Sequence, residues 1–237
     1  MKYLILNFAL LFSLQSFAQF TFINYDFTVP MDQQEVFMKT MNEFFTSKTG
    51  KEMPMAALSM HTFGYDKNFT HSMTMWHPDP KMVNKMVDPT LMMGNEDFQK
   101  VMMTFSKIGF KPSQSVTGRE LISSEQVEGN TFQTLWFINV EDPQATATAF
   151  SQLVEDSKDI LKKTNSRLAL GQLLSGQQLG ESHYVLGTFK DYATFVEATD
   201  LMYSSEGFAN WSKSTAANSL VRVDSRIIMN IWNMPTE

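Results

Sequence analysis

Histidine and methionine alternate along one short segment of this chain. His71, Met73, Met75 and His77 occupy every second position, and the segment is predicted to be a strand. Alternating residues of a strand share one face, with neighbours about 6 to 7 Å apart. Imidazoles and thioethers suit Cu(I), and His61 on the preceding predicted strand could add a further nitrogen. The segment therefore predicts a copper site as one interpretation.

Core packing is the competing interpretation of these methionines. Of the 18 methionines, 14 lie between Met31 and Met103, and many occupy ordinary apolar positions. Methionine is a flexible residue that fills gaps in cores. The sequence leaves both interpretations open.

Two arginines form the second candidate site. Arg119 lies in the predicted strand 113–122 and Arg226 in the predicted strand 219–232. If both side chains point into a space between two sheets, their guanidinium groups could hold an anionic or carbonyl-bearing ligand. Asp224 lies on the same predicted face as Arg226 and is a further cavity-lining candidate. Alternatively, each arginine pairs with a local carboxylate such as Asp224. The opposite faces are predicted to contact helices and carry Val116, Ile122, Val221, Val223, Ile227 and Met229.

Aromatic side chains could line the same space. The candidates are Tyr25, Tyr184, Trp76 and Trp136, with Tyr184 counted among the cavity-lining residues. Aromatic residues are also common core residues. Their presence therefore permits a pocket without requiring one.

Composition and motif searches exclude several functions. The 237 residues include no cysteine, which rules out thiolate chemistry and Cys-ligated metals. The formal charge of −6 argues against a nucleic-acid partner, whose phosphates attract clustered Lys and Arg. No glycine-rich dinucleotide loop, Walker loop, zinc-protease helix or serine elbow occurs. No cofactor is expected, apart from copper in the alternative above.

Hydrophobic periodicity predicts one order of elements, β-α-β-β-α-β, twice. A register of 113 positions pairs Phe27 with Val140 and Phe37 with Phe150 across some sixty positions. The first set of predicted elements is 21–29, 32–49, 55–63, 69–76, 80–108 with a break near Pro89 and Gly94, and 113–122. The second is 134–140, 145–163, 167–174, 183–189, 191–213 and 219–232.

The N-terminus has the parts of a secretory signal peptide. Lys2 precedes an apolar run, and the small residues Ser16 and Ala18 precede Gln19. We predict cleavage after Ala18, export to the periplasm or medium, and no membrane insertion of the mature chain. The remaining divisions are a first repeat at 19–122, a linker at 123–131 and a second repeat at 132–237.

Each predicted repeat is a split βαβ, or ferredoxin-like, unit. The last predicted helical stretch of each carries a similar motif, Glu96-Asp97-Phe98 in the first and Glu206-Gly207-Phe208 in the second. This pattern resembles the dimeric α+β barrel superfamily, here with both halves in one chain. The resemblance implies an α+β fold in which two sheets close face to face as a monomeric pseudo-dimer. The family includes cofactor-free antibiotic-biosynthesis monooxygenases, haem-using enzymes and members without known activity.

Two classes of function follow. The first is an exported α+β barrel that binds a small ligand, related to cofactor-free monooxygenases, with its status as an enzyme left open. The second is a non-enzymatic periplasmic protein, either a soft-metal binder that uses the His71 strand or an interaction module. No residue matches a catalytic signature of the family.

Overall fold

Eight antiparallel strands form a closed barrel in the computed structural model, which describes residues 20–63, 69–177, 180–217 and 221–233. The order around the barrel is β1-β3-β2-β8-β5-β7-β6-β4. The strands are β1 (Thr21–Thr28), β2 (Met55–Phe63), β3 (His71–His77), β4 (Lys111–Ser123), β5 (Phe132–Asn139), β6 (Arg167–Ser175), β7 (His183–Phe189) and β8 (Val221–Asn233). The mixed α+β class agrees with the expected fold, but the two expected sheets join edge to edge into one closed eight-stranded barrel.

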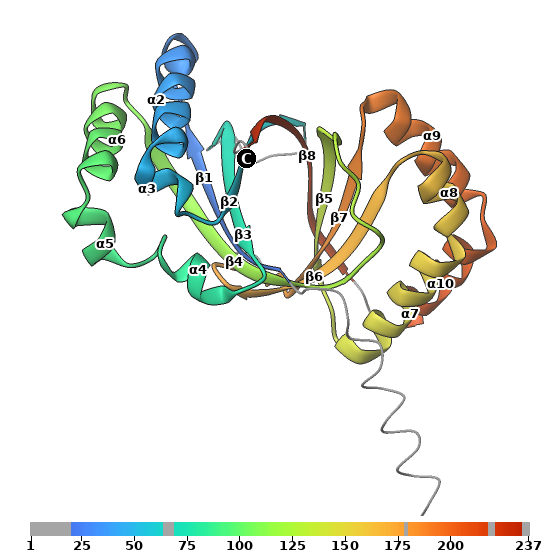
Figure 1. Ribbon diagram of the computed structural model, residues 1–237. Helices are drawn as coiled ribbons and strands as arrows, with labels where there is room; N and C mark the ends of the chain where they lie inside the picture. Colours follow the sequence, from blue (N-terminus) through green and yellow to red (C-terminus); the bar gives the residue numbers. More distant parts are fainter. Residues whose placement is uncertain (1–19, 64–68, 178–179, 218–220, 234–237) are drawn as a thin grey trace, which may run out of the picture.

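The helices form two layers on opposite sides of the strands (Figure 1). On one side lie the 3₁₀ helix η1 (Met31–Gln33), α2 (Gln34–Thr46), α3 (Lys48–Lys51), α4 (Pro80–Asn84), α5 (Pro89–Gly94) and α6 (Glu96–Lys107). On the other side lie α7 (Pro143–Asp156), α8 (Lys158–Lys163), α9 (Tyr192–Tyr203) and α10 (Glu206–Ala217). Within the described chain, no helix is both long and apolar enough to cross a bilayer.

Each long predicted helix is divided in the structure. The predicted segment 80–108 is α4, α5 and α6, and its expected break near Pro89 and Gly94 is confirmed. Asp88 accepts a hydrogen bond from the Thr90 N–H, and Asn95 accepts one from the Phe98 N–H. Such side chains satisfy the free N–H groups of a new first turn and so start a new helix. The predicted helices 145–163 and 191–213 are likewise divided, into α7 and α8 and into α9 and α10.

Strand pairing across the halves closes the barrel. β4 pairs with β6, and β2 pairs with β8. Because side chains alternate along a strand, each strand sends one face toward its helices and the other into the barrel. The two largest apolar cores lie between the strands and their helices, and a smaller apolar cluster around Phe137 and Tyr184 fills part of the barrel interior.

A buried histidine follows a hydroxyl residue at the start of β3 and again at the start of β7. The Thr70 hydroxyl accepts a hydrogen bond from the Val29 N–H (3.2 Å) and bonds to Nδ1 of His71 (2.7 Å). Ser182 has the same two partners in the second half, the Val140 N–H (3.1 Å) and Nδ1 of His183 (2.9 Å). Burial lowers the pKa of His71 to about 4 and also lowers the pKa of His183.

These histidines predict loss of stability in mild acid. Below the ordinary pKa of about 6.5, the unfolded chain binds protons at His71 that the folded chain does not, so the free energy of unfolding falls with pH. Between about pH 6.5 and 4 we expect His71 to remove on the order of 1 to 3 kcal/mol. Urea denaturation at several pH values measures this slope.

Two histidine variants isolate this contribution. In His71→Gln the slope should become shallower over this pH range. His77→Gln serves as the matched control, because His77 lies on the same strand but is partly exposed. An unchanged slope in His71→Gln would contradict the assignment.

Candidate functional site

A buried carboxylate joins several strands inside the barrel. Asp26 of β1 is only 1% exposed. Its Oδ1 accepts hydrogen bonds from Asn24 Nδ2 (2.7 Å) and from the Ser72 hydroxyl of β3. Its Oδ2 accepts from Gln114 Nε2 of β4 (2.5 Å) and from Arg226 Nη1 of β8 (3.0 Å). Four donors therefore occupy both carboxylate oxygens, as a buried charge requires.

Arg226 points into the barrel interior, as the alternation of its strand predicts. Its guanidinium carbon lies 4.9 Å from the ring centre of Phe69 and 4.7 Å from that of Phe137. Cation–π contacts of this kind add to the ion pair when the group is desolvated. The carboxylate beside it is Asp26, 200 positions earlier in the chain. Asp224, the expected local partner, lies on β8, and its side chain is outside the part that the structure describes.

His61 of β2 completes this buried polar cluster. Its Nε2 bonds to the Ser72 hydroxyl, whose proton goes to Asp26. Nε2 must therefore donate to the serine oxygen. A histidine that activates a serine must instead accept the serine proton. Burial lowers the pKa of His61, and the Asp26 charge only partly opposes this effect. The cluster is therefore a structural network and not a nucleophilic triad.

The expectation that Arg119 points into the same space is wrong. Arg119 is exposed on the outer side of β4, where Nε (3.0 Å) and Nη2 (2.8 Å) both donate to Oε1 of Gln172. Val116, expected to contact helices, belongs instead to the apolar cluster inside the barrel. The apolar face of this strand was expected to contact helices, which put Arg119 on the inner face. Part of the barrel interior is itself apolar, so the apolar face with Val116 points inward and Arg119 points outward. The two arginines therefore do not converge.

Tyr184 lies in the barrel interior, where it fills space. Its ring meets Phe22 edge-on at 5.4 Å, and it covers Gly171 so closely that a Cβ there would lie 2.1 Å from the Tyr184 Cζ. Burial raises the pKa of the Tyr184 hydroxyl. Neither of the two cavities described below includes Tyr184, Arg119 or Arg226.

The predicted copper ligands do not converge either. Met73 and Met75 share a face of β3 as expected, but that face contacts the core beneath α2 and α6. His71 lies on this same face, with its ring 6.0 Å from Phe27, whereas His61 points into the barrel. His77 accepts a hydrogen bond from the Asp79 N–H (2.9 Å). No group of three His, Asp or Glu residues in the described segments could hold a metal ion, so copper is not supported.

A cavity of about 220 Å³ lies between strands β5, β6 and β7 and helices α7, α9 and α10. Its walls are almost entirely apolar, and seven of the thirteen lining residues are aromatic. The lining residues are Trp136, Ile138, Phe150, Leu153, Leu168, Val185, Phe189, Phe195, Thr199, Met202, Tyr203, Phe208 and Trp211. Trp136 was among the aromatic candidates from the sequence. The other lining residues were not identified, because they come from six elements that only the fold brings together.

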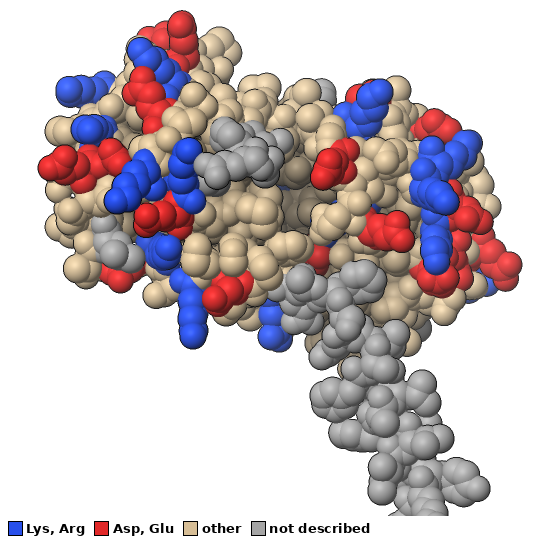
Figure 2. All heavy atoms as spheres, viewed as in Figure 1, with Lys and Arg blue, Asp and Glu red and all other residues tan. Residues whose placement is uncertain are grey.

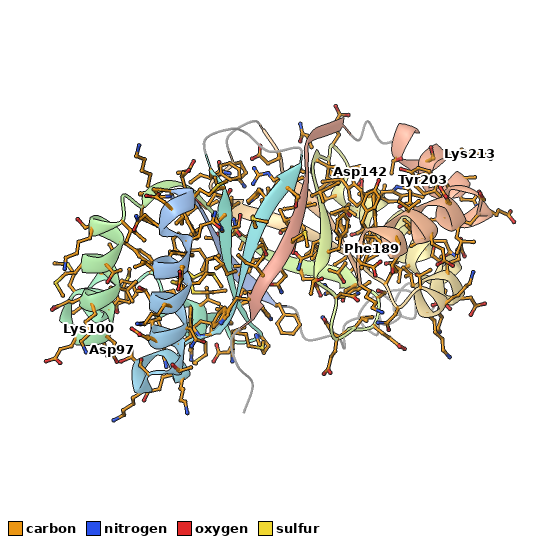
Figure 3. All side chains as sticks on the ribbon, turned by 90° about the horizontal axis from the view of Figure 1, so that it is seen from above. Asp97, Lys100, Asp142, Phe189, Tyr203 and Lys213 are labelled. Atoms are coloured by element: carbon orange, nitrogen blue, oxygen red, sulfur yellow. The ribbon has the colours of Figure 1, made fainter. Side chains whose placement is uncertain are left out.

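The cavity has a rigid floor and a more open mouth. Phe150 and Phe189 are fully buried, whereas Tyr203 at the end of α9 is 62% exposed. Figure 3 shows Phe189 between the strands and the helices, with Tyr203 on the outer helical layer. The rings of Tyr203 and Phe208 lie 4.6 Å apart at the mouth. The cavity therefore reaches from the buried core to the surface at Tyr203.

Few polar atoms line this cavity. The lining residues with a polar side-chain atom are Thr199 and Tyr203, with hydroxyls, and Trp136 and Trp211, with indole N–H groups. All four can donate a hydrogen bond, and none belongs to a charged side chain. The lining offers no carboxylate or imidazole to act as a general base.

The buried ion pair predicts a large cost for losing one partner. Arg226→Met leaves the Asp26 carboxylate buried without its cation and should lower the free energy of unfolding by about 3 to 5 kcal/mol. In Asp26→Asn/Arg226→Met the loss should be smaller than the sum of the single losses. Urea denaturation of the four proteins measures this coupling.

An exposed ion pair supplies the matched control. Lys163 and Glu197 lie 3.1 Å apart with side chains 63% and 54% exposed. Lys163→Met should cost less than about 1 kcal/mol. If Arg226→Met cost as little, the buried pair would not be the stabilising interaction that its geometry indicates.

Comparisons with known proteins find similarity in structure alone. No family model matches the chain, and no curated protein sequence matches it. A candidate monooxygenase from Lactobacillus acidophilus NCFM has a TM-score of 0.61 at 11% identity, covering 91% of this chain and 95% of that one.

Two further solved structures are similar. An anthrone oxidase-like protein gives a TM-score of 0.57 at 10% identity, covering 92% of this chain and 93% of that one. A novel heme-binding protein from Thermus thermophilus gives 0.53 at 8%, covering 90% and 91%. This chain therefore has the α+β barrel fold of monooxygenase-like and chlorite dismutase-like proteins.

Proposed function

We propose that this protein binds a small, flat, neutral aromatic molecule in the cavity between strands β5, β6 and β7 and helices α7, α9 and α10. The observation that carries the proposal is the largely apolar lining, in which seven of thirteen residues are aromatic. Ligand pockets of proteins are mostly apolar with a few polar groups that orient the ligand. Aromatic walls favour an aromatic ligand, because rings gain from stacked and edge-to-face contacts beyond the burial of their area.

The polar atoms of the cavity indicate the polar part of the ligand. Thr199 and Tyr203 offer hydroxyls, and Trp136 and Trp211 offer indole N–H groups. A hydroxyl or carbonyl oxygen on the ligand could accept from them. A charged group would be buried without a counterion, which is costly. The ligand class is therefore phenol-like or quinone-like rather than an aromatic acid.

A cofactor-free oxygenation is the reaction that best suits this lining, if the bound molecule is a substrate. In such a reaction O₂ oxidises a ring CH₂ group of an electron-rich aromatic substrate: one oxygen atom enters as a carbonyl, and the other leaves as water with the two hydrogens, so the protein supplies no redox group. The similar folds of a candidate monooxygenase and an anthrone oxidase-like protein support this class over hydrolysis. The function that we assign to this cavity is binding of the aromatic ligand.

Haem does not fit the cavity. One structure of similar fold is described as heme-binding, and haem iron needs an axial ligand such as His, Cys, Met or Tyr. Met202 and Tyr203 are lining residues of types that can ligate haem iron, but the lining contains no His or Cys and no Lys or Arg that could pair with the haem carboxylates. Burying those carboxylates without a cation is costly.

We also infer that the two halves arose as repeats of one unit. The strands of the halves begin at Thr21 and Phe132, Met55 and Arg167, His71 and His183, and Lys111 and Val221. These starts are 111, 112, 112 and 110 positions apart, so the strand bounds favour offsets slightly below the expected 113. The Thr70-His71 and Ser182-His183 pairs, 112 positions apart, add support because both make the same hydrogen bonds.

A fluorescence titration tests the binding proposal. Because Trp136 and Trp211 line the cavity, 2-naphthol should quench tryptophan emission with saturation, whereas charged 2-naphthoate should bind at least tenfold more weakly. Thr199→Phe should fill the cavity and weaken 2-naphthol binding at least tenfold. Val196→Phe on the same helix is the matched control, since Val196 is 38% exposed and outside the lining. Equal binding by the two variants would overturn the proposal.

Export of the chain remains a proposal, and a mass measurement tests it. Residues 1–19 lie outside the described residues. On expression in a Gram-negative bacterium, we expect a periplasmic protein that begins at Gln19. Ala18→Arg should block cleavage, because signal peptidase sites need small residues, whereas Ala18→Ser should be processed. Intact mass spectrometry of the periplasmic fraction gives the result, and an uncleaved cytoplasmic chain would refute the proposal.

A further inference from the structure

A second cavity, of about 360 Å³, lies in the other half of the molecule among α3, α4, α5 and the start of α6. We propose that it binds a small amphipathic anion, namely an alkyl carboxylate whose chain lies on methionines and whose head group meets two lysines. The lining residues are Lys48, Thr49, Glu52, Met53, Lys85, Met86, Met92, Asn95 and Phe98.

The floor of this second cavity is apolar and joined to the core of the first half. Met86 is 4% exposed, and its carbonyl accepts a hydrogen bond from the Tyr25 hydroxyl (3.3 Å). The Phe98 ring meets Phe44 edge-on at 5.7 Å. Met53 and Met92 complete the apolar surface. Thioether side chains are flexible and adapt to ligands of variable shape, which suits an alkyl chain better than a rigid ring.

Two lysines give the rim its charge. The Lys85 ammonium donates to the backbone carbonyl of Glu52 (3.0 Å), which does not neutralise it. Within the described segments, neither Lys48 nor Lys85 forms an ion pair with a carboxylate. The Glu52 side chain lines the same cavity, so the lining carries a net charge of about +1. The chain as a whole carries −6, so this cavity is a local positive site on an acidic protein.

The polar wall beside the lysines is already held in place. Asn95 Nδ2 donates to the Thr49 hydroxyl (3.0 Å), and Thr49 donates to Asp97 Oδ2 (2.9 Å). The Thr49 hydrogen bond lowers the pKa of Asp97, so this acceptor stays ionised. Asp97 and Lys100 lie on the outer helical layer (Figure 3), and they pair with each other at 3.7 Å. The Thr49 hydroxyl already donates its proton to Asp97, so Lys48 and Lys85 are the donors for an anionic head group.

The two cavities differ in charge although they occupy related places. Phe98 is the third residue of α6 and Phe208 the third residue of α10, and each lines the cavity of its own half. The cavity at Phe208 has no charged lining residue. The geometry therefore separates ligands by charge, with neutral aromatic molecules in one half and amphipathic anions in the other. The second assignment rests on its own residues and does not depend on the first.

Isothermal titration calorimetry with decanoate, below its micellar concentration, tests the proposal on the full protein. Decanol is the matched neutral probe. We expect one decanoate to bind per chain, at least tenfold more tightly than decanol, with an affinity that falls as salt is added. In Lys48→Met/Lys85→Met the decanoate affinity should fall at least tenfold while the decanol affinity stays the same.

Two controls separate this site from the rest of the molecule. Lys39→Met/Lys81→Met removes the same charge from exposed positions outside the lining and should leave decanoate binding unchanged. Thr199→Phe, which fills the other cavity, should also leave it unchanged. Thermal melts followed by circular dichroism establish that each variant is folded.

Three results would overturn the assignment. They are equal affinity for decanol and decanoate, an equal loss in the two double lysine variants, and loss of decanoate binding in Thr199→Phe. The last result would place decanoate in the aromatic cavity. Failure of 2-naphthol to bind, with decanoate binding intact, would refute only the proposed function above.

Discussion

The buried Asp26 carboxylate is the interaction on which the arrangement of the barrel depends. It receives donors from β1, β3, β4 and β8, and His61 of β2 reaches it through Ser72. The ion pair with Arg226 stands beside the seam where β2 and β8 pair. A buried charge that loses its partner is strongly destabilising. Any shift of strand register at this seam would separate the partners, so the network favours one way of closing the barrel.

The interior of the barrel is polar around Asp26 and Arg226 and apolar around Phe137 and Tyr184. Asn24, Asp26 and Thr74 point inward from the first half, and Leu135, Phe137 and Leu186 form the apolar cluster opposite. Side chains therefore fill the interior, and the two described cavities lie outside it, between strands and helices. On the face shown in Figure 2, acidic and basic side chains are interspersed over both helical layers without a broad basic patch.

Sequence reasoning identified the elements better than the directions of their side chains. It placed the eight strands, the α+β class and the inward position of Arg226. It placed Arg119 on the wrong face of its strand. Strand alternation separates the two faces, but it does not show which face points into the barrel when both are partly apolar. It grouped His71, Met73 and Met75 on one face of β3 and left open whether they bind a metal or fill a core. The contacts with Phe27 and with the core beneath α2 and α6 decided for the core.

The sequence by itself determined the periodicities, the capping residues and the absence of cysteine, since these depend on neighbours along the chain. The helix starts at Asp88 and Asn95 also depend on the local sequence alone, because each capping side chain bonds to an N–H two or three residues later. Only the tertiary structure joined Asp26 to Arg226 across 200 positions. It alone gathered Trp136, Phe150 and Tyr203 around one cavity. Contacts of this kind depend on how strands close into a barrel, and no local pattern encodes the distance between residues that far apart.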